Sequence, residues 1–518
     1  MKLSPVVDEL IRVFEVAKAE GKDSARFSVS QAISTLAVLY EKARNAVEFR
    51  AEHLVRRAAI ERILKRRILI NGGAKNIAEN LVTELLWAKY VDSSLIDEGK
   101  VVEIQQIINR YLVLKHEITT AQLSWNSILG VASSEIDEAI IPAKRREGLV
   151  NFFYLAIRPK ITLEIDPQIL NMLSYIAAER AYAQSDDALI SFHLLKMILP
   201  NWTQTTAQGV QQEVGTVVQT LRLIEANLRS PTVDALYRYA RRKTPPFLLL
   251  RDFFFDVGDQ AHSFLDDPEK LEAKLAEIAN RRYHETGTKV RRAVVRSFIY
   301  IFLTKMLFAF ALEAPYDVYI ARKLSYLPLG INMLFPPILL FLVAGLFRVP
   351  GTDNTQRLIA RIKKILYDFD SLKNEKDVFT PKQAEKRPIL TAVFSVAYLA
   401  TFGITFGMIH TVLGLLQFNI ASQIIFVFFV ALVSFFAYRI RQSAKEYEMV
   451  EQQGVLEPVA DFFFLPVLAA GNLLSRGIAK LNLFIFLFDF ILEAPLKVIF
   501  EVAEEWIRFI RIKKEEII

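Results

Sequence analysis

Four side chains near the middle of the chain have the types and the spacing of a metal site. Asp252, Asp256, Asp259 and His262 recur at intervals of four, three and three residues, so a helix would place them on one face. Carboxylates and imidazoles on facing helices bind divalent metals in helix bundles. The sequence shows no matching motif on a second helix, so an acidic surface beside three phenylalanines is the competing interpretation. We expect no metal and no cofactor.

A second group of residues could bind anions. The stretch RAEHLVRRAAIERILKRR contains six basic residues on one predicted helix: Arg56, Arg57, Arg62, Lys65, Arg66 and Arg67. Anionic lipid headgroups attract basic residues near the membrane surface by about 1 kcal/mol each, and nucleic-acid phosphates attract them as well. Glu52 and Glu61 lie in the same stretch, so a solvated, partly neutralised helix face is the alternative.

Motifs of known enzyme classes are missing from the sequence. It contains no nucleophile elbow, no His-Glu-x-x-His and no dinucleotide fingerprint. The segment Asn71-Gly72-Gly73-Ala74-Lys75 lacks the spacing of a phosphate loop and indicates the end of a helix. With no cysteine, the chain cannot form disulfides, use a catalytic thiolate or bind zinc through sulfur. Nothing in the sequence therefore argues for an enzyme.

Composition indicates a polar part joined to a membrane part. Of the 518 residues, 52 % are hydrophobic and 38 are phenylalanine, yet 23 % are charged. Before about Arg292 no apolar run approaches the roughly 20 residues that cross a bilayer, whereas such runs dominate afterwards. The net charge of +7 is not concentrated in one region, which argues against nucleic-acid binding.

The N-terminal part, residues 1–290, is predicted to be a cytosolic all-α domain with a seam near residues 200–215. Helical periodicity runs through nearly all of it, and no alternating strand pattern is present. Capping residues before proline or an acid predict helix starts at Asp166-Pro167, Ser185-Asp186, Ser230-Pro231 and Asp267-Pro268. Gly287 and Thr288 are expected to end the last of these helices. The first residues lack the apolar core of a signal peptide, which favours a cytosolic location.

Four apolar runs after this domain predict a polytopic α-helical membrane domain. Residues 297–312 and 327–347 form a first helix pair within 291–347, and residues 389–416 and 420–438 form a hairpin within 388–438. The charged stretch 348–387 between them is expected to be a cytosolic loop. Basic residues lie before the first run, within 348–387 and after the last run, and basic flanks mark the cytosolic side. This pattern predicts that both termini are cytoplasmic. In a rival topology only the hairpin crosses and 297–347 dips in and returns.

The C-terminal region 439–518 does not fit a simple crossing. Its apolar segments 462–474 and 481–492 are each too short to cross alone, so we expect them to lie in the interface or to re-enter, with spanning as the alternative. The tail beyond Pro495 is amphipathic. It is expected either to lie along the headgroups or to pack on the N-terminal domain.

A nine-residue segment occurs twice. LFAFALEAP at residues 307–315 returns as LFDFILEAP at 487–495, and in each copy a glutamate and a proline close an apolar run. The prolines predict a helix that bends at the interface. Charges in membrane segments are usually paired, so we expect Lys305 to face Asp489 or one of the glutamates, Glu313 and Glu493. Carboxylates placed simply at the headgroup boundary are the alternative.

Three further features lie inside the apolar runs. Pro336 and Pro337 interrupt one run beside Asn332, as in a transporter's broken helix or a plain kink. Gly403 and Gly407 form a small-xxx-small pair suited to close helix packing. His410 could exchange protons or simply hydrogen-bond a neighbouring helix.

These features predict a cell-membrane protein with several crossings that acts as a scaffold, a tether or a membrane-organising module. The expected partners are the lipid bilayer, anionic headgroups and other copies of the chain, and no partner protein can be identified. An oligomeric channel or transporter, with a path lined by the intramembrane polar residues, is the first alternative. A membrane enzyme using the Asp252–His262 face is the second.

Overall fold

The computed structural model of the chain describes residues 3–15, 38, 41, 52–71, 76–118, 123–308, 315–316, 319, 326–345, 350–374, 379–380, 388–449, 465–474, 502, 506 and 509. Every regular element among these residues is a helix, and the one pairing of strand type is an isolated bridge between Ile161 and Phe379. The predicted all-α class is confirmed for the described part of the chain.

Two compact units make up the chain. The N-terminal unit consists of Leu3–Arg241, Phe369–Pro381 and Asn482–Ile518, and the bundle unit consists of Met1–Lys2, Arg242–Asp368 and Lys382–Leu481. Helix α12 (Pro231–Val257) starts in the first unit and ends in the second. The division therefore falls near residue 241, whereas the sequence predicted a boundary at 290 and a seam at 200–215.

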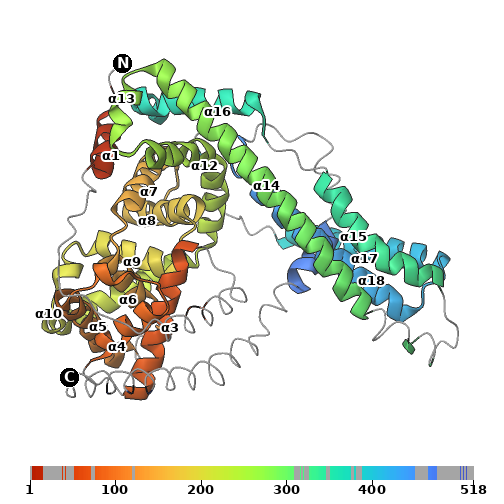
Figure 1. Ribbon diagram of the computed structural model, residues 1–518, viewed down its shortest axis with the longest axis horizontal. Helices are drawn as coiled ribbons and strands as arrows, with labels where there is room; N and C mark the ends of the chain where they lie inside the picture. The colour runs from red at the N-terminus through yellow and green to blue at the C-terminus, as the bar shows by residue number, and fades with distance from the viewer. Residues whose placement is uncertain are drawn as a thin grey trace, which may run out of the picture. The chain divides into compact units, whose positions relative to one another are not determined.

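The N-terminal unit is a stack of helices around α6 (Trp125–Ile140), whose residues Ile128–Ile136 are all buried (Figure 1). The predicted starts at Asp166 and Asp186 are confirmed, because their side chains accept hydrogen bonds from the first backbone N–H groups of α8 and α9. The other helices of the unit are α1 (Pro5–Glu15), α3 (Glu52–Asn71), α4 (Ile77–Trp87), α5 (Glu98–Ile118), α7 (Lys144–Ile157), α8 (Pro167–Ala178), α9 (Asp187–Ile198), α10 (Ala207–Gln212) and α11 (Val214–Leu228).

A glycine sets the distance between α6 and α9. A Cβ atom at Gly130 would lie 2.9 Å from Cβ of Ala188, closer than real carbon atoms approach. The two backbones can therefore pack closely only because residue 130 has no side chain. This contact joins the N-terminal half of α6 to the first turn of α9.

The bundle unit is organised by α14 (Pro268–Phe308), one continuous helix of 41 residues. At about 1.5 Å per residue it is about 60 Å long. The predicted interruption at Gly287 and Thr288 is wrong. A single glycine costs a helix about 1 kcal/mol, which packing along the rest of the helix offsets. The predicted domain boundary at residue 290 lies inside this helix.

The two ends of α14 pack against different helices (Figure 1). Helices α13 (Ala261–Leu265) and α16 (Thr352–Tyr367) lie beside its N-terminal part. Helix α16 occupies part of the stretch 348–387 that was predicted to be a loop. High charge obscured its amphipathic period, in which Leu358, Ile362 and Ile365 are buried.

The C-terminal part of α14 packs with α15 (Tyr326–Gly345) and α18 (Ile420–Ala444). A core of Ile301, Leu340, Phe429, Val433 and Ala437 joins the three helices. The ring centroids of Phe298 and Phe341 lie 5.1 Å apart, and those of Phe335 and Phe426 lie 5.2 Å apart. Asn332 and Phe335 of α15 contact Ser422 and Phe426 of α18 in the same order, so these two helices are parallel. Phe298 packs near the end of α15, whereas Lys305, further along α14, lies beside Phe429 in the first half of α18, so α14 is antiparallel to both.

Two helices of the described part are long and apolar enough to cross a membrane. They are Ala392–Leu415, within α17 (Pro388–Leu415), and Ile420–Tyr438, within α18. The apolar stretches Pro328–Phe341 and Leu465–Leu474 are shorter. A Cβ atom at Gly471 would lie 2.2 Å from the carbonyl oxygen of Ala431, so the segment 465–474 packs backbone to backbone against the middle of α18.

Candidate functional site

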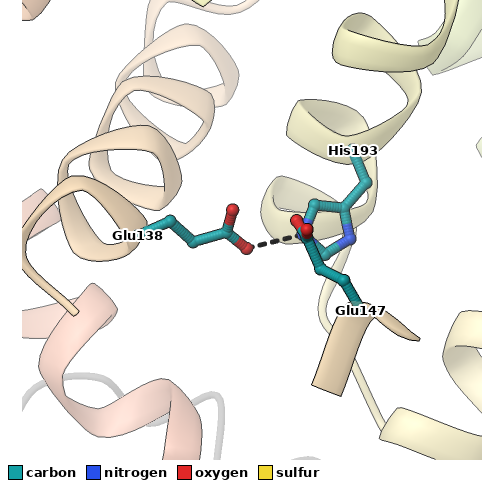
Figure 2. Close-up of side chains that lie close together, drawn as sticks. All are labelled: Glu138, Glu147 and His193. Atoms are coloured by element: carbon teal, nitrogen blue, oxygen red, sulfur yellow. Dashed lines mark hydrogen bonds and ion pairs between the residues drawn. The ribbon is translucent and has the colours of Figure 1, made fainter. Parts of the chain in front are cut away.

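The N-terminal unit gathers a histidine and three glutamates, of which His193 and Glu179 are buried and Glu138 and Glu147 are partly buried. Glu138 comes from the last turn of α6, Glu147 from the first turn of α7 and His193 from the middle of α9 (Figure 2). Nε2 of His193 lies 2.6 Å from Oε1 of Glu138 and 3.4 Å from Oε1 of Glu147. Its Nδ1 lies 2.5 Å from Oε1 of Glu179, which follows α8.

Local structure explains why these groups meet. The short segment 141–143 joins α6 to α7, so the last turn of one helix lies near the first turn of the next. The close approach at Gly130 brings α9 alongside α6. Glu179 begins a short π-helical turn (Glu179–Ala183), and the hydroxyl of Ser185 donates a hydrogen bond of 2.5 Å to its second oxygen.

Electrostatics makes His193 a cation. Burial alone would lower the pKa of His193, but the charge of Glu179 and the hydrogen bonds to Glu138 and Glu179 outweigh it and raise the pKa to about 9. Burial would raise the pKa of Glu138, yet His193 and Lys196 together lower it to about 2. The imidazole is therefore protonated near neutral pH, and both ring N–H groups donate to carboxylates.

The same residues provide a possible set of metal ligands. Glu138, Glu147 and His193 place three ligand atoms within 4.8 Å of one another, a combination that could hold a divalent metal. In the structure, however, the ammonium group of Lys196 bridges the carboxylates of Glu138 and Glu147. A metal would have to displace this ammonium and the proton on Nε2.

Charge counting favours a structural role for this group, which we call the His193 cluster: Glu138, Glu147, Glu179, His193, Lys196 and Arg146. Its three carboxylates are balanced by the imidazolium, by Lys196 and by Arg146. Burial would raise the pKa of Glu179, but the charge and hydrogen bond of His193 and, to a smaller extent, the charge of Arg146 lower it. The cluster is thus neutral as it stands. It ties α6, α7 and α9 to the end of α8, so it fixes the centre of the unit.

A cavity of about 440 Å³ adjoins the His193 cluster and is lined by Glu138 and Lys196 among other polar groups. Arg110 and Glu135 form a buried ion pair on its wall, each with 4 % of its side chain exposed. Arg110 also donates hydrogen bonds to the backbone carbonyls of Trp202, Thr203 and Thr205. The cavity is therefore framed by side chains that are already engaged in holding the 202–205 turn.

The basic group on α3 is mostly used within the unit. Arg56 pairs with Asp137 at 2.5 Å, Arg57 with Glu61 and Asp186, Arg62 with Glu41, and both Arg66 and Arg67 with Glu84. Lys65 is exposed. The structure thus places five of the six residues in ion pairs that join α3 to other parts of the unit.

The predicted Asp252–His262 face is divided among three elements. Helix α12 ends at Val257, and Gly258 adopts a φ of +56°, so Asp259 and His262 follow on a 3-10 turn and on α13. The two acids on α12 are engaged with cations. Asp252 pairs with Arg251 and Arg282, and Asp256 pairs with Lys274 and Arg281.

Asp252 instead anchors the segment that follows α18. The hydroxyl of Tyr447 donates a hydrogen bond of 2.6 Å to Asp252, and burial raises the pKa of Tyr447. Asn354 of α16 donates to the carbonyl of Tyr447 at 2.9 Å and accepts from the N–H of Met449 at 2.9 Å. The chain leaving the bundle is therefore fixed to α12 and α16.

The predicted intramembrane polar residues that the structure describes take part in separate contacts. Lys305 is fully buried, with its Nζ 4.7 Å from the ring centroid of Phe429. The fully buried Asn332 donates to the carbonyl of Ser422 at 3.3 Å, and α15 continues as a helix through Pro336 and Pro337, which are both buried.

On α17, Nδ1 of His410 lies 2.6 Å from Oε1 of Gln423, a bond between helices like the one expected of a packing histidine. Gly403 and Gly407 are exposed with open space where a Cβ atom would lie. The predicted partners of Lys305, namely Glu313, Asp489 and Glu493, lie outside the described residues.

Sequence reasoning missed the His193 cluster. The signal available was a single histidine within the apolar run of α9, with Lys196 one turn later. A buried imidazole requires polar partners. Those partners lie 14 and 55 residues away in the sequence, so spacing within one helix could not reveal them.

Comparison of the chain with protein-family models, with curated proteins and with solved structures found no match. The functional conclusion therefore depends on the geometry described above.

Proposed function

We propose that this chain is a multi-pass membrane protein that holds its N-terminal unit at the cytosolic face, where the unit serves as a scaffold or tether. The stretches 297–312, 327–347, 389–416 and 420–438 would be its crossings.

The surface of α17 carries this proposal. Only 6 % of the apolar stretch Ala392–Leu415 is buried, and every residue from Ala392 to Ala400 is exposed. Phe394, Leu399 and Leu415 are each more than 60 % exposed. Burying a side chain of this size is worth about 1.5–3 kcal/mol, so a helix that is apolar on all sides requires a lipid environment or an equivalent apolar cover.

The distribution of charged residues and the burial of two polar side chains support the same proposal. The described residues of α17 and the stretch to Tyr438 contain no Asp, Glu, Lys or Arg, whereas α18 continues into Arg439 and Arg441. Positive flanks mark the cytosolic side. Lys305 and Asn332 are covered by protein in the described bundle, which favours packing roles over a conduction path.

Single-cysteine labelling tests the topology, since the natural chain has no cysteine. Gln417→Cys, in the turn between α17 and α18, should react with a membrane-impermeant thiol reagent in intact cells. Lys144→Cys and Asp370→Cys should react only after lysis, and the parent chain is the control. Recovery of the protein in the soluble fraction, or labelling of Lys144→Cys in intact cells, would overturn the proposal.

A further inference from the structure

Four basic side chains on α14 lie where the helix changes from polar to apolar. Lys289, Arg291, Arg292 and Arg296 are all exposed, and none has an ion-pair partner among the residues that the structure describes. This differs from the basic residues of α3, which are mostly paired within their unit. Four unpaired cations within eight residues leave a strong positive charge on this part of the helix.

An exposed apolar stripe begins at the same level. Val295, Ile299, Leu303 and Leu307 recur every four residues, and their exposed fractions are 45, 52, 59 and 65 %. Residues with this spacing lie on one helix face. The other face of α14 is buried against α15 and α18 through Ile301 and Lys305. The stripe is therefore the outward face of this part of the bundle, and it begins at Val295, directly beside the basic residues.

The register of the bundle brings basic residues of α18 to the same level. Phe335 of α15 packs on Phe426 of α18. Because α15 and α18 are parallel, Phe341, six residues further along α15, lies level with about residue 432 of α18. Phe298 of α14 packs on Phe341 and therefore lies at that same level. Because α14 and α18 are antiparallel, moving six residues back from Phe298 to Arg292 corresponds to moving forward to about residue 438. The backbone positions of Arg439 and Arg441 therefore lie at the level of the four α14 residues.

We propose that Lys289, Arg291, Arg292 and Arg296, at the level of the backbone positions 439 and 441 of α18, form a basic belt that binds the phosphate groups of anionic phospholipids in the cytosolic leaflet. This inference rests on the proposed membrane location. Guanidinium groups bind phosphate oxygens in pairs, and the acyl chains of the same lipid would lie along the apolar stripe of α14. The belt thus fits a ligand with an anionic head and an apolar tail.

Lipid titration of the purified full-length protein in neutral detergent tests the belt, with phosphatidylglycerol and phosphatidylcholine as probes and native mass spectrometry as the readout. In the belt variant, Lys289, Arg291, Arg292 and Arg296 are all changed to Gln. The matched control changes four exposed basic residues elsewhere to Gln: Lys65, Lys144, Arg238 and Arg242. A third variant keeps the charge with Arg291→Lys, Arg292→Lys and Arg296→Lys.

Wild type, control and charge-keeping variant should bind phosphatidylglycerol at least ~10-fold more tightly than phosphatidylcholine, and the belt variant should lose this preference. Equal binding of both lipids by the wild type overturns the inference. Displacement of phosphatidylglycerol by inorganic phosphate also overturns it, because the site would then recognise free phosphate without the lipid tail. Carbonate extraction of membranes is done first and distinguishes the two failures. If the protein is extracted as a soluble protein, the proposed function is wrong. If it stays in the membrane but shows no lipid preference, only the inference about the belt is wrong.

Discussion

Replacing His193 by glutamine should remove a pH-dependent contribution to the stability of the N-terminal unit. The pKa of His193 rises from 6.5 in the unfolded chain to about 9 in the fold. Since each pKa unit is worth about 1.4 kcal/mol, the charged imidazole contributes about 3 kcal/mol. The depressed pKa of Glu138 describes the same contact from its other partner, so the two effects are not added.

The sign follows from linkage. A group whose pKa is raised by folding stabilises the fold fully below its unfolded pKa, and this contribution disappears as the pH rises through its folded pKa. The free energy of unfolding of the wild type should therefore decrease between pH 6.5 and pH 9. The His193→Gln variant should be about 3 kcal/mol less stable at pH 6.5 and should show no such decrease.

Urea denaturation followed by tryptophan fluorescence provides the assay, with the full chain in detergent. The four tryptophans, Trp87, Trp125, Trp202 and Trp506, all belong to the N-terminal unit, so their emission reports on the unit that contains His193. His284→Gln, at an exposed position of the bundle unit, is the control. A wild-type free energy of unfolding that stays constant from pH 6.5 to pH 9 would refute the reasoning.

Three other substitutions test the packing. Arg110→Met should cost about 3–5 kcal/mol in the same urea assay, because it leaves Glu135 buried without its cation, and a loss below about 1 kcal/mol would contradict the buried pair. Gly471→Leu should lower the melting temperature in detergent, since its Cβ would collide with the backbone of α18, whereas Gly403→Leu has open space and should leave it unchanged. Equal melting temperatures for these two variants would argue against the contact. Tyr447→Phe removes the hydrogen bond to the buried carboxylate of α12, so about 1.5–3 kcal/mol should be lost, and unchanged stability would mean that the bond contributes nothing.

Local features of the fold could be predicted because their causes lie within a few residues. Asp166 and Asp186 cap helices whose first N–H groups are their immediate neighbours. Gly287 shows the limit of the same reasoning. It has a poor helix propensity, but tertiary packing along α14 decides the outcome.

The candidate site could not be predicted, because ionic partners are chosen by tertiary contacts. Arg57 illustrates this, since it is only 2 % exposed and pairs with Asp186, which lies 129 residues further along the chain. A basic run in the sequence reports the number of charges but not the carboxylates that the fold brings to them. The same is true of Asp252, whose tyrosine partner lies 195 residues further on.

The unbroken course of α14 has a mechanical consequence. A rod about 60 Å long that is fixed at one end in the helical bundle and at the other against α13 and α16 transmits tilt as displacement. Tilting it by about 10° would move its far end by about 10 Å, which is the diameter of a helix. In the proposed membrane location, a change in bilayer thickness that tilts the bundle would therefore displace the far end of α14, without any hinge inside the helix.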